Sequence, residues 1–384
     1  MSKTKNYRIL ILSASVGAGH VRAGNAIKGS LETLLPNATI KHIDVLETTN
    51  KVFRKIYSDG YFAMVKHFPH WIRKIYDKLD NAADNSIDKK VRIALYRANF
   101  KKLIAILKED WDIVINTHFL APELISYLQQ HDEQLSNLSQ ISVITDFDVH
   151  KLWFNGTNQS YFVSNTEARN YLISLGVLAD NVHATGIPID PVFTKKKDYD
   201  ICLKKHGFVD NLPIVLMIGS RIDSDSNLKI YESLQKVKTP IQLCVIAGKD
   251  AKFKSDLESI KKHHFTKIIG FTHEIDELMT IADVVITKPG GLTSSELLVK
   301  GCPMIIINPI PGQEEHNTQY LLQNGCAIKP FHPETISSEL ERLLLDKSAL
   351  KNMKISSKRH GKPYSARHVV EKCLQILTTE KSKT

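Results

Sequence analysis

Residues 284–296 read VVITKPGGLTSSE, an apolar run followed by a glycine turn, small hydroxyl residues and a glutamate. The apolar run 284–287 predicts a buried strand, and the stretch from Thr293 predicts the start of a helix. Such a turn offers free backbone N–H groups, hydroxyls and the positive end of a helix dipole to a diphosphate. Glu296, one turn into the helix, suits the two hydroxyls of a ribose. The simpler interpretation is a Gly-Gly turn with an ordinary helix cap.

The same strand-then-helix rhythm extends in both directions from this stretch. Strands are predicted at 8–12, 40–45, 113–116, 142–145, 161–163, 214–218, 241–247, 267–269, 284–287 and 304–307. Helices are predicted at 21–35, at 124–128, from 167 onward and at 371–378, with a long helical region at 51–107. Strands that alternate with helices predict an α/β fold with parallel sheets covered on both faces.

The rhythm breaks once, at 186–191 (GIPIDP), where two prolines lie three residues apart. A chain of 384 residues exceeds one ordinary core. We therefore predict two doubly wound, Rossmann-like domains, 1–190 and 191–384, facing a central cleft. Ligands of such folds bind at the carboxyl ends of the strands.

Two further strand ends carry polar residues. The first predicted strand runs into SVGAGH at 15–20, where two glycines let a ligand approach and His20 is a candidate general base. The third glycine of a dinucleotide fingerprint is missing, so NAD binding is not favoured. Asp146, in VITDF at 143–147, suits a proton acceptor or a partner that orients His20. The simpler interpretations are a capping or core histidine and a loop aspartate that caps its own turn.

The loop 309–317 reads PIPGQEEHN and groups amide and carboxylate side chains. These suit the several hydroxyls of a sugar, although a polar surface loop has the same composition.

The net charge is +10, and 51–102 holds 13 Lys and Arg against 5 Asp and Glu, a difference of +8. Aromatic residues interleave with these bases. The segment suits an anionic membrane surface or single-stranded nucleic acid, or a solvated helix with core aromatics.

Five scattered cysteines without a C-x-x-C pair support neither a zinc nor a redox site and suit a reducing cytosol. The apolar run 9–12 is too short for a signal peptide, and no run reaches the ~20 residues of a membrane span. We therefore expect a cytoplasmic protein.

The motifs at 17–20 (GAGH), 287–296 and 311–317 together resemble those of the diacylglycerol glycosyltransferases of glycosyltransferase family 28. This group includes the processive diacylglycerol glucosyltransferases and the monogalactosyldiacylglycerol synthases. The segments 144–154 and 186–188 are similar as well, so the likeness runs from about residue 8 to 327. The resemblance implies a GT-B fold and an inverting transfer without metal or cofactor.

The resemblance also implies roles for individual residues. The C-terminal domain would hold the UDP-sugar through Gly219, Ser220, Phe271, Thr272, Gly290, Gly291, Thr293, Glu296, Gln313, Glu314 and Asn317. The N-terminal domain would take the lipid acceptor and the membrane through Gly19, Trp153, Phe62, Phe68 and Trp71. His20 would be the catalytic base, with Asp146 orienting it. One departure is the loop 218–225 (IGSRIDSD), because its carboxylates sit badly beside a diphosphate.

The predicted function is transfer of a hexose from UDP-glucose or UDP-galactose to diacylglycerol. The expected place is the inner face of the cell membrane, on anionic lipid and without nucleic acid. Three alternatives are another lipid acceptor, a UDP-N-acetylglucosamine 2-epimerase and a non-enzymatic UDP-sugar sensor. An epimerase needs no membrane, so the basic and aromatic segment counts against it.

Overall fold

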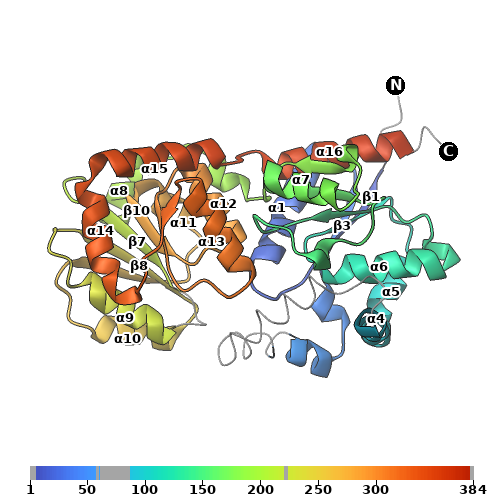
Figure 1. Cartoon of the computed structure of the whole chain (residues 1–384), viewed down its shortest axis with the longest axis horizontal. Helices are drawn as coiled ribbons and strands as arrows, with labels where there is room; N and C mark the ends of the chain where they lie inside the picture. Colours follow the sequence, from blue (N-terminus) through green and yellow to red (C-terminus); the bar gives the residue numbers. More distant parts are fainter. Residues whose placement is uncertain (1–5, 58–59, 61–86, 220–223, 381–384) are drawn as a thin grey trace. The chain divides into compact units, whose positions relative to one another are not determined.

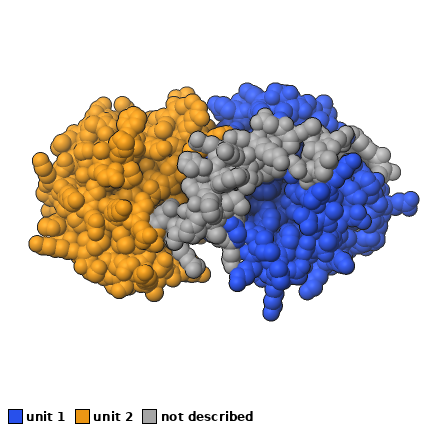
Figure 2. Space-filling model, turned by 60° about the horizontal axis from the view of Figure 1, so that its bottom comes forward, with its two compact units in different colours: residues 1–191, 311–313, 364–384 blue, residues 192–310, 314–363 orange. Residues whose placement is uncertain are grey.

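The computed structural model describes residues 6–57, Gly60, 87–219 and 224–380. Two compact units make up the chain, coloured separately in Figure 2. Unit 1 comprises Met1–Pro191, Pro311–Gln313 and Tyr364–Thr384, and unit 2 comprises Val192–Ile310 and Glu314–Pro363. Each unit holds a six-stranded parallel sheet, so the predicted α/β fold class is confirmed.

The sheet of unit 1 has the strand order β2-β1-β3-β4-β5-β6. Its strands are β1 (Arg8–Ser13), β2 (Thr39–Asp44), β3 (Ile113–Asn116), β4 (Gln140–Val143), β5 (Ser160–Val163) and β6 (Val182–Ala184). Its helices are α1 (Gly19–Leu34), α4 (Ile87–Asn99), α5 (Lys101–Leu107), α6 (Leu120–His131), α7 (Thr166–Ser174) and α16 (Ser365–Glu380). Short 3₁₀ turns lie at η1 (Val45–Thr48), η2 (Glu133–Leu135), η3 (Lys151–Trp153) and η4 (Ala179–Asn181). The turn η5 (Pro191–Thr194) begins at the last residue of this stretch of unit 1 and continues into unit 2.

Strand β1 shows why the sequence of a strand in this sheet is an unbroken run of apolar residues. Ile9 and Ile11 pack against α1 and α16, whereas Leu10 and Leu12 pack against α5 and α6. Successive side chains point to opposite faces, and both faces are covered by helices. A strand buried on both sides therefore needs apolar residues at every position.

The predicted helical region 51–107 is interrupted in the structure. Residues 51–57 are helical, and α4 and α5 are separated at Phe100, a fully buried residue. Phe53 packs edge-to-face on Phe100 with ring centroids 5.6 Å apart, and Tyr57 and Tyr96 join the same core cluster. For these four aromatics the core interpretation is confirmed. Phe62, Phe68 and Trp71 lie outside the described residues.

Unit 2 repeats the architecture with the strand order β12-β11-β10-β7-β8-β9. Its strands are β7 (Ile214–Ile218), β8 (Gln242–Gly248), β9 (Phe265–Gly270), β10 (Val284–Thr287), β11 (Met304–Ile306) and β12 (Ala327–Ile328). Its helices are α8 (Tyr199–His206), α9 (Ser224–Leu234), α10 (Ala251–Ser259), α11 (Ile275–Ile281), α12 (Gly291–Lys300), α13 (Gln313–Gln323), α14 (Ile336–Leu345) and α15 (Lys347–His360), with η7 (Pro333–Thr335). Residues of α9, α10 and α14 form one core with β7 and β8.

The last helix corrects the predicted domain range 191–384. Val369, Val370, Cys373 and Leu377 of α16 are buried in one cluster with the residues of β1 that face α1. Figure 1 shows α16 beside α1. An apolar stripe predicts a packed helix, but it does not say which sheet the helix covers. In this chain the C-terminal helix returns to unit 1.

Among the described residues, no helix combines the length and the apolar character needed to cross a membrane.

The return of α16 can be tested by a substitution in its buried stripe. Leu377→Ala should lower the unfolding free energy of unit 1 by about 2–5 kcal/mol, because it leaves a cavity against the sheet. The three tryptophans of the chain, at 71, 111 and 153, all precede residue 191, so their fluorescence reports unfolding of unit 1.

The matched control is Leu343→Ala in α14, which removes an equally buried leucine from unit 2. The control should leave the tryptophan-detected transition in place. A tryptophan transition that moves with Leu343→Ala and not with Leu377→Ala would contradict the assignment of α16.

Candidate active site

The strand order of unit 1 creates one place where loops diverge. The chain steps from β1 to β2 in one direction and from β3 through β6 in the other. The loops after β1 and β3 therefore leave neighbouring strands toward opposite sides and open a crevice between them. Gly17 makes the turn after β1 with φ +93°, a conformation that favours glycine, and α1 begins directly after it.

His20 occupies the first turn of α1 and is held by both neighbouring loops. Its Nδ1 lies 3.0 Å from the carbonyl oxygen of Thr117 and 2.8 Å from Oγ1 of Thr145. A carbonyl oxygen only accepts hydrogen bonds and a threonine hydroxyl can accept as well, so both contacts are satisfied when Nδ1 carries the proton in the neutral ring. The lone pair is thereby left on Nε2, where a general base needs it.

The charge state of His20 also suits a base. Burial lowers the pKa of the His20 imidazole below its usual 6.5, while the negative charge of Asp146 and the bond to Thr117 oppose that shift. The ring is therefore neutral at pH 7 and able to take up a proton. Thr117 and Thr145 contact Nδ1 of the ring, and the charge of Asp146 raises its pKa. The orienting role of Asp146 stays a prediction.

His118 packs beside His20. Its ring meets His20 edge-on with centroids 4.6 Å apart and stacks on Phe119 at 4.1 Å. Its Nδ1 accepts a hydrogen bond from the backbone N–H of Leu120 at 3.2 Å. Burial, followed by the charges of His20 and His150, holds the pKa of His118 well below its usual value. His118 is thus an uncharged ring packed against His20, and the sequence interpretation missed it.

Trp153 packs behind His118 and Phe119. Its ring is 5.9 Å from Phe119, and none of it is exposed. Its indole Nε1 has no hydrogen-bond partner among the described residues. Trp153 was predicted at the acceptor side; the structure places it beneath Phe119, so Phe119 is the more accessible of the two rings.

The predicted donor residues of unit 2 follow the carboxyl ends of its strands, and its switch point lies between β7 and β10. Gly290 caps α12 with an extended backbone and, as a glycine, supplies no capping side chain. The first turn of α12 holds no acidic residue. The positive end of this helix, with Gly291 and Thr293, therefore suits an anion.

The loop after β11 comes close to this helix start. A Glu314 carboxylate oxygen lies 3.9 Å from where a Cβ of Gly290 would stand, and the other accepts from the backbone N–H of Ile310 at 2.6 Å. Asn308 in the same loop has a positive φ of +44°, a strained conformation that clusters at functional sites. Glu296 and Asn317 are almost completely buried below the loops, and Gln313 begins α13.

The ends of β7 and β9 supply the rest of the predicted set. Phe271 is 55% exposed, with Lys249 Nζ 4.9 Å from its ring centroid, and Thr272 follows it. Lys249 was missed although it directly follows β8. Gly219 has no room for a side chain, because a Cβ would stand 2.6 Å from the ring of Phe253. Ser220 lies outside the described residues.

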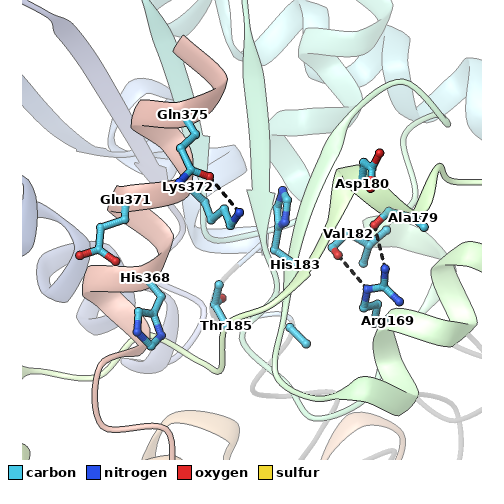
Figure 3. Close-up of a pocket in the computed structure, with 11 residues that line it drawn as sticks. Arg169, Ala179, Asp180, Val182, His183, Thr185, His368, Glu371, Lys372 and Gln375 are labelled. Atoms are coloured by element: carbon cyan, nitrogen blue, oxygen red, sulfur yellow. Dashed lines mark hydrogen bonds between the residues drawn. The ribbon is translucent and has the colours of Figure 1, made fainter. Parts of the chain in front are cut away.

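Two clusters elsewhere do not join these sites. A cavity of about 700 Å³ lies between α7, the edge strand β6 and α16, where His183 stands between Lys372 and Arg169 (Figure 3). None of the predicted site residues lines it.

The side chains of His206, Glu274 and Glu277 lie close enough together to hold a metal ion. However, Lys205 Nζ lies 2.8 Å from both carboxylates. This bonding lowers the pKa of Glu277 to about 2, so the group is an ion-pair network between α8 and α11.

Comparisons with known proteins give the family of the chain. The family described as "Monogalactosyldiacylglycerol (MGDG) synthase" matches residues 20–189, and "Glycosyl transferases group 1" matches 199–360. A Bacillus cereus (strain B4264) protein named processive diacylglycerol beta-glucosyltransferase is 30% identical over 383 residues. That alignment covers 96% of this chain and 94% of the relative. The chain belongs to the diacylglycerol glycosyltransferase family.

The resemblance inferred from the motifs is thereby confirmed, and so is the enzyme class. Solved structures place this glycosyltransferase in the GT-B fold. S. aureus MnaA, in a co-structure with UDP, has a TM-score of 0.62 at 13% identity, covering 95% of both chains. Acinetobacter baumannii MurG has a TM-score of 0.58 at 12% identity, covering 96% of this chain and 98% of that chain.

The lowered pKa of His118 predicts how acid affects the stability of this glycosyltransferase. The pKa of His118 is lowered on folding, so below about pH 6.5 the unfolded chain binds a proton that folded unit 1 does not. Stability of unit 1 should therefore fall as the pH drops from 7 toward 5, by at most about 1.4 kcal/mol per pH unit for this residue.

His118→Asn keeps an acceptor for the N–H of Leu120 and removes the titration. Denaturant unfolding followed by tryptophan fluorescence should then show a shallower loss of stability in acid. His131→Asn, at an exposed histidine of α6, is the control. An equal slope for both variants and the unmodified chain would exclude His118 as a source of the acid sensitivity.

Proposed function

We propose that this glycosyltransferase moves a hexose from a UDP-sugar to the hydroxyl of diacylglycerol at the cytoplasmic face of the cell membrane. The observation that carries the proposal is His20, whose Nδ1–H is fixed by Thr117 and whose Nε2 is left as a base. Family membership gives the reaction class, and this histidine gives it a mechanism.

The proposed step is a single displacement. His20 Nε2 takes the proton of the acceptor hydroxyl as its oxygen attacks the anomeric carbon of the donor. The bond from that carbon to the β-phosphate oxygen breaks on the opposite side, so the configuration inverts. UDP leaves with the electron pair. The start of α12 at Gly290 stabilises the diphosphate as its charge develops.

The donor is proposed to lie along the strand ends of unit 2. Phe271 offers an exposed ring for the uracil, and Glu296 is proposed for the ribose. Gln313 and Glu314 are proposed for the sugar hydroxyls. Glucose is the first donor to test, because the relative that matches nearly the whole chain carries a glucosyltransferase name. Galactose is the second, because the family that matches 20–189 carries the galactosyl name.

The membrane is proposed to be met by the region around α4. Val52 and Ile56 in the helix 51–57, and Val91 and Leu95 in α4, are exposed apolar pairs one helical turn apart. Asn50 donates a hydrogen bond of 2.6 Å to Asn99, which ties the two segments together. The sequence segment 51–102, which contains these residues, carries a net charge of +8, and basic residues with exposed apolar side chains suit an anionic lipid surface.

An assay with radiolabelled UDP-glucose and UDP-galactose in parallel tests the function. The acceptor is diacylglycerol in vesicles with or without phosphatidylglycerol. We expect label from one donor in the organic phase, and more of it with the anionic vesicles. UDP binding without transfer from either donor would favour a different acceptor or the sensor alternative.

In the same assay, His20→Ala should lower kcat by roughly 10²–10⁴-fold, the usual contribution of a positioned base, with little change in the affinity for UDP. Ser142→Ala, a buried serine of β4, controls for general disturbance of the sheet. Full turnover by His20→Ala would remove His20 from the role of base.

Donor binding by unit 2 can be tested without turnover. Phe271→Ala should weaken the binding of UDP by about 5- to 100-fold in calorimetry, the usual loss when an aromatic ring that stacks on a base is removed. The control is Phe331→Ala, because Phe331 is 99% exposed in the same unit and far along the chain from the strand ends of the site. Equal affinities for both variants would place the uracil elsewhere.

A further inference from the structure

A chain of hydrogen bonds runs behind His20 and has no part in the reaction as described so far. Asn25 Oδ1 lies 2.9 Å from His42 Nδ1, and His42 Nε2 lies 2.7 Å from Ser13 Oγ. Ser13 Oγ lies 2.7 Å from Thr117 Oγ1. Thr117 Oγ1 donates to the backbone carbonyl of His20 at 3.0 Å, so the chain ends at the catalytic histidine.

The acceptors at the two ends of this chain fix its direction. The amide oxygen of Asn25 accepts, so His42 carries its proton on Nδ1 and accepts at Nε2 from the hydroxyl of Ser13. The proton of Ser13 is then committed to His42, so Ser13 Oγ accepts from the Thr117 hydroxyl at 2.7 Å. The single hydroxyl proton of Thr117 is shared between Ser13 Oγ and the His20 carbonyl in a three-centre hydrogen bond. His42 and Ser13 thereby hold Thr117 in place.

Thr117 and His20 are thereby joined twice. The His20 ring donates to the Thr117 carbonyl, and the Thr117 hydroxyl donates to the His20 carbonyl. Such a reciprocal pair fixes both the backbone and the ring of the base. Ser13 and Thr117 are fully buried, so water does not replace a missing member of the chain.

The fold makes room for this chain at one glycine. A Cβ at Gly24 of α1 would stand 2.6 Å from both His42 Nε2 and Ser13 Oγ. Ser13 and His42 lie on the face of the sheet that α1 covers, because His42 pairs with Ile11 in the ladder. Glycine therefore lets the helix approach closely enough for the polar side chains to meet beneath it.

We propose that His42, acting through Ser13 and Thr117, is a positioning residue that holds His20 in the Nδ1–H tautomer and in the orientation of a base. The expected effect of His42 on turnover rests on the proposed function. The expected effect of His42 on the His20 ring does not.

His42 is suited to this work at neutral pH. Burial, followed by the charge of Lys28 on α1, lowers the pKa of His42, while Asp44 on its own strand opposes the shift. The ring is therefore neutral and keeps Nε2 as an acceptor. A protonated ring would donate to Ser13 and reverse the direction of the chain.

Four variants test the proposal. His42→Leu removes the acceptor, whereas His42→Gln offers a carbonyl oxygen near the former position of Nε2. Ser13→Ala breaks the chain one step closer to Thr117. Ser142→Ala is the matched control, because Ser142 is equally buried in β4 and is hydrogen-bonded by Gln159 at 2.9 Å.

The first readout is the ¹⁵N spectrum of the His20 ring in the full chain, assigned by comparison with His20→Ala. In the unmodified chain we expect the Nδ1–H tautomer. His42→Leu and Ser13→Ala should lower the share of that tautomer and the pKa of the ring, and His42→Gln should restore both. This readout needs no turnover, so it stands even if diacylglycerol is not the acceptor.

The second readout is the pH profile of transfer. His42→Leu should lower kcat about three- to tenfold, the effect of one weakened hydrogen bond, with the KM for the UDP-sugar unchanged. The acid limb of its profile should move to lower pH. Where His42→Leu fails to fold, His42→Gln and Ser13→Ala decide. A His20 ring in Ser13→Ala that matches the ring in Ser142→Ala overturns the proposal.

Discussion

The hydrogen bond from His20 Nδ1 to the Thr117 carbonyl is the contact on which the site of unit 1 depends. It joins the loop after β1 to the loop after β3, two strands that are neighbours only because the chain reverses its direction of winding between them. The same bond decides which ring nitrogen is basic. The strand order thus determines which nitrogen of the His20 ring is protonated, through one N–H and one carbonyl oxygen.

Burial around this bond has two opposing effects. It excludes water from the hydrogen bonds of Ser13 and Thr117, which makes each of them stronger and its loss more costly. It also lowers the pKa of His20, which would make the histidine a weaker base. The charge of Asp146 and the Thr117 carbonyl offset part of that loss. His20 is therefore neutral at pH 7 and retains part of its basicity.

Much of the fold could be predicted from the sequence, because strands covered on both faces leave apolar runs such as 8–12 and 284–287. The two strands that were missed, β6 and β12, have only three and two residues, too few to form a pattern. The sheet that α16 covers could not be predicted either, because the apolar stripe of a helix does not indicate what the helix packs against. Within the site, His20 follows a glycine turn and could be found. His118 and Lys249 have no such local signal and gain meaning only from the strands beside them.

In the proposed reaction, the two units use different physical means for its two halves. Taking a proton requires a group whose charge can change, and unit 1 supplies a histidine whose tautomer and pKa are fixed by buried neighbours. Stabilising a leaving diphosphate requires charge complementarity that need not change, and unit 2 supplies backbone N–H groups at the start of α12. A titratable group needs a precise surrounding network, whereas a helix start needs only glycine and the absence of a capping side chain. This difference explains why the proposed diphosphate-binding motif of unit 2 is readable in thirteen consecutive residues, 284–296, whereas the neighbours of His20 come from separate segments of the chain.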